Sequence, residues 1–322
     1  MTSAVIVGAG AIGSWLADAL IRGGWSVSIV ARGATLAVLQ QSGLTLLEGD
    51  NERISHPRCG VPGVLGVHDY VILAVKAHQL AALAPTLVPL IGEATTLVSA
   101  TNGIPWWFFE DFGGVLCGRE LASVDQGGAQ RRTFGQRALG AVVHATARAL
   151  SPGRVEVKAA DRLILGEPRG ESSVRLERLA AAFSAGGVRV VATPDIRAEI
   201  WSKLWGNMCI NPVSALTRGT TQRLFRDENV RGLLEDMMRE MQELGARLDL
   251  RLAMTPAERM QVAERLGDFK TSMLTDIEAG RSLELAPQLG ALVEIAGVLD
   301  LKTPKMSVVL ALASLLSQHS GA

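Results

Sequence analysis

A glycine-rich turn near the N-terminus separates a strand pattern from a helix pattern. Residues 3–7 (SAVIV) are apolar and rich in β-branched side chains, and the sequence GAGAIG follows directly. Apolar residues then recur at helical spacing as far as Gly23-Gly24, and residues 26–30 (SVSIV) repeat the strand pattern. Strand, turn, helix and strand within about 30 residues form a βαβ unit. The first part of the chain is therefore predicted to be an α/β fold with a parallel sheet.

The turn carries glycine at the three positions of the GxGxxG pattern, Gly8, Gly10 and Gly13, with Ala11 and Ile12 between the last two. The first glycine permits the tight turn, the second lets the backbone approach a pyrophosphate, and the third allows the helix to pack closely on the strand. The helix N-terminus then directs its free N–H groups at the phosphates. We expect a Rossmann-type dinucleotide site here. The alternative is an ordinary glycine-rich turn between a strand and a helix.

The end of the second strand indicates which dinucleotide binds. An NAD site places Asp or Glu there to bind the ribose hydroxyls, but residues 29–33 read IVARG and contain no carboxylate. Arg32 is instead placed to bind a 2′-phosphate. The sequence favours NADP over NAD; the alternative is a solvent-exposed arginine at a strand end.

The pattern of the sequence changes after Thr193-Pro194-Asp195. Before this point, strand patterns and one helix pattern (174–185) continue the α/β region, with glycine and proline punctuation that indicates an antiparallel extension; the strand patterns lie at 70–75, 95–99, 115–117, 140–146, 154–158, 162–166 and 188–192. After it, helical patterns predominate, at 196–211, 230–248, 257–279, 286–299 and 304–317. We predict a Rossmann-type NADP-binding domain at residues 1–194 and an all-helical substrate and catalytic domain at residues 195–322. The length of 322 residues agrees with two domains.

The charge balance argues against several classes of function. The chain has 32 basic and 32 acidic residues, so it lacks the basic surplus that binding to nucleic acid or to an anionic membrane requires. No uncharged apolar run approaches the ~20 residues of a membrane span, and the N-terminus lacks the basic region of a signal peptide. Three separated cysteines and five scattered histidines indicate neither a disulfide framework nor a metal site. We expect a soluble, cytoplasmic protein without a metal.

Residues 196–211 carry a polar stripe within an otherwise apolar helix pattern. Lys203, Asn207 and Asn211 follow one another at steps of four, so they share one helix face within about 80°. Trp201 and Trp205 fall on nearly the opposite side, where they can be buried. Asparagine is a poor helix former, and solvent-exposed stripes favour Glu and Lys. The stripe predicts a functional face on which the lysine is a proton donor or a carboxylate ligand; the alternative is a surface lysine with an asparagine near the helix end.

With this helix, the chain resembles the ketopantoate reductase (2-dehydropantoate 2-reductase) family over essentially its full length. The lysine helix and the segment Ser272–Leu274 are the most specific parts of the resemblance. The matching pieces are, in chain order, GAGAIG with Arg32, Ala74–Ala77, Thr101–Gly103, Arg197–Leu204, Asn207, Asn211-Pro212, Ser272–Leu274 and Gly280-Arg281 with Glu284.

The resemblance implies an oxidoreductase that uses NADPH to reduce a 2-keto acid to a 2-hydroxy acid, by default 2-dehydropantoate to pantoate in pantothenate biosynthesis. Lys203 then resembles the general acid that protonates the carbonyl oxygen, because the transition state of hydride transfer builds negative charge there. Glu284 resembles the carboxylate that contacts the substrate hydroxyl and pairs with the lysine. A partly desolvated lysine would have a lowered pKa, and a nearby carboxylate would offset that shift.

Five further residues take roles from the resemblance. Asn207 and Asn211 resemble substrate-binding amides, Ser272 resembles the hydroxyl that holds the substrate carboxylate, and Asn102 and Lys76 resemble residues on the nicotinamide side of the site. Asn102 is expected to contact substrate as well as cofactor. Each has an ordinary alternative: for instance, Ser272 could be a helix hydroxyl bonded to its own backbone, and Lys76 a strand-end charge.

Two segments depart from the family pattern. The aspartate that commonly follows the glutamate is replaced by Ala286, and four aromatic residues, 106–109, follow Asn102-Gly103. These aromatics either pack in the core of a helix that begins at Pro105, or form an apolar wall that suits a substrate other than ketopantoate.

Four alternatives therefore stay open. Three concern the function: a family member acting on another, more apolar keto substrate, a 3-hydroxyacid or opine-type dehydrogenase, and a regulator that binds NADPH without catalysis. The fourth concerns the leucine- and methionine-rich C-terminal helices, which could form a homodimer interface instead of an internal core.

Overall fold

The chain forms two compact units that are not simply its two halves. The computed structural model describes residues 1–319. The first unit comprises Met1–Thr101, Pro105–Glu120 and Asp125–Ile196, and the second comprises Asn102–Ile104, Leu121–Val124 and the chain from Arg197 onward. The predicted boundary at residue 195 placed both short segments in the first domain, whereas their contacts place them in the second unit.

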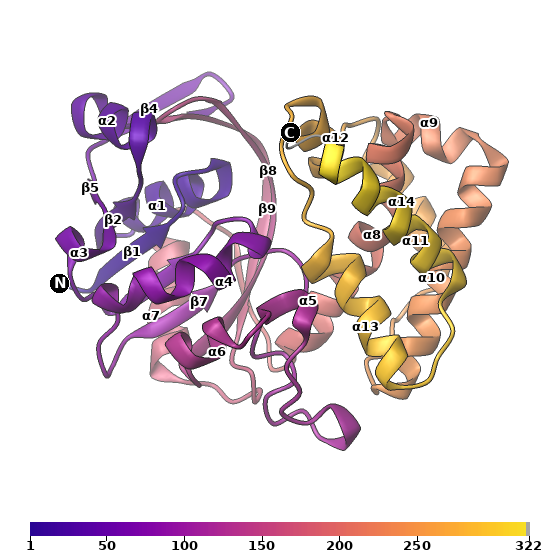
Figure 1. Ribbon diagram of the computed structural model, residues 1–322. Coiled ribbons are helices and arrows are strands. Elements are labelled where there is room, and N and C mark those ends of the chain that lie inside the picture. The colour runs from indigo at the N-terminus through magenta and orange to yellow at the C-terminus, as the bar shows by residue number, and fades with distance from the viewer. Residues whose placement is uncertain (320–322) are drawn as a thin grey trace. The chain divides into compact units, whose positions relative to one another are not determined.

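A single ten-stranded sheet forms the frame of the first unit (Figure 1). The strands are β1 (Ser3–Val7), β2 (Ser26–Val30), β3 (Leu44–Glu48), β4 (Asn51–Ser55), β5 (Arg58–Gly60), β6 (Tyr70–Leu73), β7 (Thr96–Ser99), β8 (Ala138–Ser151), β9 (Arg154–Gly166) and β10 (Val190–Ala192). Their order is β4-β3-β9-β8-β7-β6-β1-β2-β5, and β10 pairs with β9. The pairs β3–β4 and β8–β9 are antiparallel and the others are parallel, which confirms the α/β prediction with an antiparallel extension.

Helices pack on this sheet and complete the core of the first unit. They are α1 (Ala11–Arg22), α2 (Gly33–Ser42), α3 (Pro62–Leu65), α4 (Leu80–Leu83), α6 (Ala129–Phe134) and α7 (Val174–Ala185). The α1 residues at helical spacing, Trp15, Leu16, Ala19 and Leu20, are buried together with strand residues and with the apolar face of α7. The N-terminal strand, turn, helix and strand therefore form the βαβ unit that the sequence predicts.

Two local features of the first unit differ from the sequence analysis. Residues 115–117 are not a strand: Gly114–Leu116 form a 3-10 turn, because Gly113, Gly114 and Gly118 all have positive φ. β3 and β4, which none of the expected strand patterns includes, form a hairpin around Gly49-Asp50, where Gly49 has φ of +58°.

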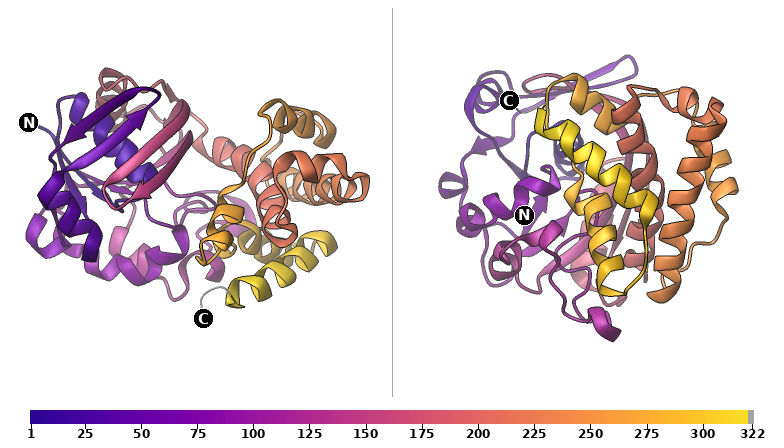
Figure 2. Two further views of the ribbon diagram at one scale, coloured as in Figure 1. Left: turned by 90° about the horizontal axis from the view of Figure 1, so that it is seen from above. Right: turned by 45° about the vertical axis from the view of Figure 1, so that its right-hand side comes forward.

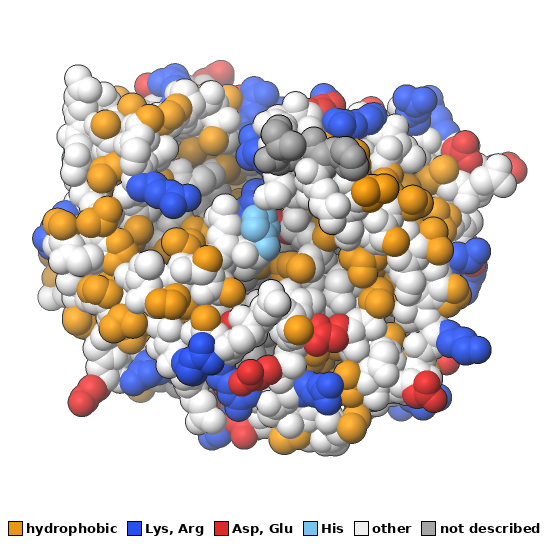
Figure 3. Space-filling model, viewed as in Figure 1, with side chains coloured by type: hydrophobic (Ala, Val, Ile, Leu, Met, Phe, Trp, Pro, Cys, Tyr) orange, Lys and Arg blue, Asp and Glu red, His pale blue; other side chains and the backbone are white. Residues whose placement is uncertain are grey.

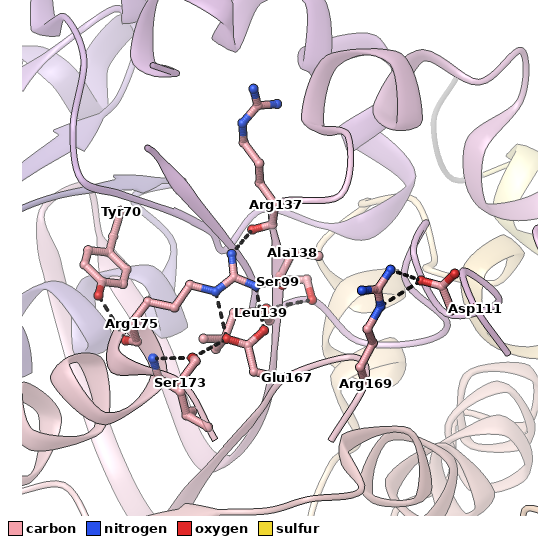
Figure 4. A network of polar contacts seen from close by, with 11 residues as sticks. Tyr70, Ser99, Asp111, Arg137, Ala138, Leu139, Glu167, Arg169, Ser173 and Arg175 are labelled. Atoms are coloured by element: carbon pink, nitrogen blue, oxygen red, sulfur yellow. Dashed lines mark hydrogen bonds and ion pairs between the residues drawn. The ribbon is translucent and has the colours of Figure 1, made fainter. Parts of the chain in front are cut away.

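A buried ion pair connects β9 to α7 (Figure 4). Arg175 donates through Nε and Nη2 to the two carboxylate oxygens of Glu167 at 2.7 and 2.6 Å. Ser173, which caps the N-terminus of α7, donates to the same carboxylate, and the hydroxyl of Tyr70 donates to the Arg175 carbonyl at 3.0 Å. The buried charge of Glu167 is therefore fully paired, and β6, β9 and α7 meet at this network.

The second unit is helical (Figure 2). Its helices are α8 (Ile196–Thr217), α9 (Thr221–Arg226), α10 (Glu228–Arg247), α11 (Pro256–Arg265), α12 (Ser272–Glu278), α13 (Ala291–Val298) and α14 (Pro304–His319), with a π-helical turn at Ala286–Gly290 before α13 and the short α5 (Ala122–Asp125) at its edge. In α10 the predicted apolar stripe is buried through Leu234, Met237, Met241 and Leu244. The fold class, a Rossmann-type region followed by a helical region, is confirmed.

The helix expected at 257–279 is two helices. Gly267, with φ of +79°, ends the path of α11, and the Thr271 side chain accepts a hydrogen bond from the Leu274 N–H to cap the start of α12. Glycine and an N-cap threonine are helix boundary signals that outweigh the continuous apolar spacing here.

On the face seen in Figure 3, acidic and basic side chains are scattered among uncharged ones. Across the described residues, no helix is both long enough and apolar enough to cross a membrane. The described part of the chain also contains no group of three or more His, Cys, Asp or Glu side chains arranged to hold a metal ion, and the three cysteines are free thiols.

Candidate functional site: a glycine turn and a lysine centre

The three glycines of the N-terminal turn, Gly8, Gly10 and Gly13, have different structural roles. Gly8 has φ of +114°, and a Cβ there would lie 2.9 Å from the Ala74 carbonyl oxygen. A Cβ on Gly13 would lie 1.9 Å from the Gly8 carbonyl oxygen, so this glycine is needed for the close approach of α1 to β1. Gly10 has no atom within 4 Å of the Cβ position. Its side of the turn is therefore open to a ligand.

The N-terminus of α1 fits the phosphates of a dinucleotide. Gly10 is its N-cap, no side chain caps the helix, and its first turn, which includes Ala11 and Ile12, carries no acidic residue. The N–H groups of this turn lack intrahelical acceptors, and the helix dipole is positive at this end. The open space over Gly10 lies beside these donors, so the residues present suit a pyrophosphate.

The strand register brings two further segments to the same edge of the sheet. Val7 of β1 pairs with Val30 of β2 and with Leu73 of β6, all in parallel. Arg32, two residues after β2, is exposed and forms no ion pair within the described residues. Lys76, three residues after β6, is half-buried. The glycine turn, Arg32 and Lys76 thus all follow the carboxyl ends of neighbouring parallel strands, where ligands bind in such sheets.

The lysine centre lies in the second unit and joins three segments. Lys203 on α8 donates a hydrogen bond from Nζ to the Oδ1 of Asn102 at 2.8 Å. Burial lowers the pKa of Lys203 to about 8, and the charge of Glu284 opposes that shift by raising it. Glu284 is itself only 8% exposed. Lys203, Asn102 and Glu284, three residues singled out from the sequence, are therefore brought together.

The segment that carries Asn102 is fixed to the segment that carries Glu284. Gly103 has φ of +90°, and a Cβ there would lie 2.3 Å from the carbonyl oxygen of Pro287. The Ile104 N–H donates to that same oxygen at 2.8 Å. The two groups that act on the lysine are thus held by one backbone contact, which the sequence analysis did not anticipate. A glycine after a functional asparagine was the available signal.

A second short segment is fixed in a similar way. The Glu294 carboxylate on α13 accepts hydrogen bonds from the backbone N–H groups of Ala122 and Ser123 at 2.8 and 2.9 Å. The Ser123 hydroxyl donates to the same carboxylate at 2.6 Å. This contact explains why residues 121–124 belong to the helical unit.

The other predicted substrate residues differ in exposure. Asn207 is half-buried and Asn211 is buried, and within residues 1–318 neither side-chain amide forms a hydrogen bond to another protein group. Both amides are therefore available to a ligand. Ser272 is the exposed first residue of α12, directly after the N-cap Thr271. Trp201 and Trp205, on the opposite side of α8, are fully buried, as the helix geometry predicts.

The aromatic residues 106–109 belong to the core of the first unit. All four are buried; Trp107 donates from Nε1 to the Ser99 hydroxyl at 2.9 Å, and the Trp106 and Phe134 ring centroids are 4.9 Å apart. The packing alternative therefore describes them, although residues 105–111 form turns and not the helix expected from Pro105. Ala286, the other departure, is exposed.

Both parts of the chain match known protein families. Residues 4–106 match the family described as Ketopantoate reductase PanE/ApbA, and residues 195–317 match Ketopantoate reductase PanE/ApbA C terminal. A curated 2-dehydropantoate 2-reductase of Mesorhizobium japonicum is 41% identical over 319 residues and covers 98% of each chain.

Solved structures share the fold over the whole chain. The crystal structure of a Ralstonia solanacearum MolK2 protein, assigned as a ketopantoate reductase, has a TM-score of 0.95 at 39% identity and covers 100% of this chain and 99% of its own. A ternary structure of D-mandelate dehydrogenase with NADH and anilino(oxo)acetate has a TM-score of 0.84 at 18% identity with full coverage of both chains, a likeness of fold alone. From its two matched regions and its full-length relatives, the chain belongs to the ketopantoate reductase family of dinucleotide-dependent oxidoreductases.

Proposed function

We propose that this protein uses NADPH to reduce the ketone of a 2-keto acid to the 2-hydroxy acid, with 2-dehydropantoate as the first substrate to test. The observation that carries the proposal is the Lys203 ammonium, hydrogen-bonded to Asn102 and close to Glu284, with a pKa lowered to about 8. The name of the Mesorhizobium japonicum relative, at 41% identity, supports the same substrate.

The residues of the lysine centre suit protonation of a carbonyl oxygen. Bound reduced nicotinamide would supply the hydride. Lys203 would donate its Nζ proton to the oxygen, where negative charge develops, and a pKa near 8 keeps most of the lysine protonated at neutral pH. Asn102 would hold the ammonium in place, and Glu284 would favour its charged form. The Asn207 and Asn211 amides and the Ser272 hydroxyl would bind the polar groups of the substrate.

Arg32 supports NADPH as the cofactor form. Its exposed guanidinium follows β2 at the edge of the sheet that carries the glycine turn, and β2 ends without a carboxylate for the ribose hydroxyls. D-mandelate dehydrogenase shares the fold, and its ternary structure contains NADH. We infer that residues at this strand end, and not the fold, select the phosphate form.

Turnover of a panel of 2-keto acids tests the proposal. The purified protein is assayed by loss of reduced-nicotinamide absorbance with 2-dehydropantoate and with bulkier, more apolar 2-keto acids, each with NADPH and NADH. Lys203→Ala is expected to reduce kcat by roughly 100-fold or more. Preference for an apolar acid would favour the alternative substrate class. NADPH binding without turnover of any keto acid would contradict the enzyme and favour the regulator.

Self-association also stays a prediction. Val308, Leu312 and Leu315 are more than half exposed along α14 at helical spacing. Light scattering of the purified protein gives its mass in solution, and a monomer at micromolar concentration would contradict the homodimer.

A further inference from the structure

The guanidinium of an arginine from another helix packs against a glycine of α8, the helix that carries Lys203. Gly206 is the only glycine in α8, and an interior glycine destabilises a helix by about 1 kcal/mol relative to alanine. A Cβ at this position would lie 2.3 Å from Nη2 and 3.0 Å from Cζ of Arg259. The absence of a side chain therefore lets the guanidinium lie directly on the helix backbone. This position on Gly206, the seat of the arginine, directly precedes Asn207 and lies about one helical turn after Lys203.

Arg259 is held in this place by its own helix. Pro256 and a capping box between Thr255 and Glu258 define the start of α11. The Arg259 N–H donates to the Thr255 carbonyl at 2.9 Å, and the next residue, Met260, is fully buried. The position of the arginine on α11 is thus fixed on both sides, which limits where its side chain can lie.

The Arg259 guanidinium has no counter-ion within residues 1–318. No carboxylate there forms an ion pair or a hydrogen bond with it, whereas the partly buried Arg175 is paired with Glu167. Burial lowers the pKa of Arg259 below its ordinary value. A guanidinium nevertheless stays charged in proteins. A half-buried cation without a partner is unfavourable unless a ligand supplies the anion.

We propose that Arg259 binds the carboxylate of the 2-keto acid, an inference that rests on the proposed function. A guanidinium pairs with a carboxylate through two parallel hydrogen bonds. Gly206 lies about 60° around the helix from Lys203 and about 4.5 Å along it. The acid group of a 2-keto acid is bonded to its carbonyl carbon, so one substrate can present its carbonyl oxygen to Lys203 and its carboxylate to Arg259.

The location favours the substrate acid over a cofactor phosphate. Gly206 lies between Lys203 and Asn207 in α8, and the proposed function assigns both of these side chains to the substrate, whereas the Cys209 thiol beside Gly206 is buried. The resemblance to the family implies that Ser272 binds the substrate carboxylate, but a hydroxyl is neutral and does not balance the negative charge of that carboxylate. The positive charge of Arg259 balances it, and the Ser272 hydroxyl can still donate a hydrogen bond to the same group.

Variants of the arginine and of its seat test the proposal on charged and neutral substrates. Arg259→Gln should raise KM for the best 2-keto acid roughly 10- to 100-fold, while kcat/KM for the methyl ester of the same acid changes less than about threefold. Arg259→Lys should retain part of the effect because it keeps the charge but not the fork. Arg265→Gln, an exposed arginine on the same helix, is the matched control and should leave both substrates unchanged.

Gly206→Ala separates recognition from stability. Alanine favours the helix, and the new methyl meets only the mobile end of the arginine side chain, so Tm should stay the same or rise. KM for the acid should nevertheless increase, because the guanidinium is displaced.

Several outcomes would overturn this proposal. Equal losses on acid and ester would show a structural role, an unchanged KM in Arg259→Gln would show no role, and a weakened NADPH Kd would show a cofactor phosphate ligand. If the native enzyme reduces no keto acid, the proposed function fails first. Calorimetry with 2-dehydropantoate on the NADPH-free protein then decides the carboxylate site by itself, since binding that is equal in native protein and Arg259→Gln, or absent from both, contradicts it.

Discussion

Lys203 Nζ donates a 2.8 Å hydrogen bond to the side-chain oxygen of Asn102, a residue 101 positions earlier in the chain. This bond uses the lysine as a donor in its charged form, while burial of the lysine favours the neutral form. Glu284 shifts the balance back toward the charge. The state of the lysine is therefore set by opposing effects, each of which a single substitution can remove.

The alkaline limb of the rate profile should report the pKa of Lys203. Because the proton is present below a pKa of about 8, kcat/KM for reduction should be level below that pH and fall about tenfold per unit above it. Glu284→Gln removes the charge that raises this pKa, so the limb should move to lower pH. Initial rates from pH 6 to about 10 measure it. A limb that stays in place in the variant would contradict the electrostatic pairing.

The contribution of Lys203 to stability should depend on pH. Below pH 8 the lysine is protonated in both states, and the folded state bears the desolvation penalty. As the pH rises from the folded pKa to the unfolded pKa of about 10.4, the penalty disappears. Lys203→Met removes this penalty but leaves the buried Glu284 carboxylate without its cation. The native protein should therefore gain roughly 1–3 kcal/mol of unfolding free energy relative to the variant between neutral pH and about pH 10. Urea unfolding at both pH values measures this, with the exposed Lys302→Met as control; the same offset at both pH values would refute it.

Arg32 should distinguish the two cofactors. Arg32→Ala removes a guanidinium that matches a phosphate, so Kd for NADPH should rise about 10- to 100-fold while Kd for NADH changes little. Fluorescence titration of the reduced cofactors gives both constants, and Arg119→Ala provides an exposed arginine of the same unit as control. Equal losses for the two cofactors would exclude the 2′-phosphate contact.

Substitution of Gly103 should impair turnover more than substitution of another glycine of the same conformation, Gly113. Gly103 and Gly113 have φ of +90° and +86°, but only at Gly103 would a Cβ collide, at 2.3 Å from the Pro287 oxygen. Both alanine variants bear the backbone strain, about 1–3 kcal/mol. Gly103→Ala alone should also lower kcat, by about tenfold or more, since it displaces Asn102 from the lysine. Thermal unfolding and turnover compare the pair, and matching values for the two variants would argue against the docking contact.

Two ion pairs of similar geometry should differ in their effect on stability. Arg175→Met leaves the Glu167 carboxylate buried and unpaired, and should lower the free energy of unfolding by about 3–5 kcal/mol. Arg169 and Asp111 are 2.8 Å apart, against 2.6 Å for Arg175 and Glu167, but their side chains are 63% and 51% exposed. Arg169→Met should therefore change the stability little. A large loss in both variants, measured by urea unfolding, would show that burial does not distinguish them.

The features found from the sequence are those that local spacing encodes. Gly8, Gly10 and Gly13 lie within six residues, and one helix period relates Lys203 to Asn207. The family resemblance added Glu284 and Asn102 but gave no geometry. The contact of Gly103 with Pro287 could not be found in this way, because it depends on how segments far apart in sequence meet. The arginine on Gly206 left a trace only as an interior glycine in a helix.

The attachment of residues 102–104 to the helical unit limits how relatives of this protein can be recombined. A chimera joined near residue 196 would take Lys203, Glu284 and Pro287 from one parent, and Asn102 and Gly103 from the other. The junction lies between compact units, yet it divides the lysine from its hydrogen-bond acceptor. Chimeras that also exchange residues 102–104 and 121–124 with the C-terminal part would keep each parent's lysine environment intact. The helical module therefore consists of three segments of the chain, and no single crossover point separates it from the rest.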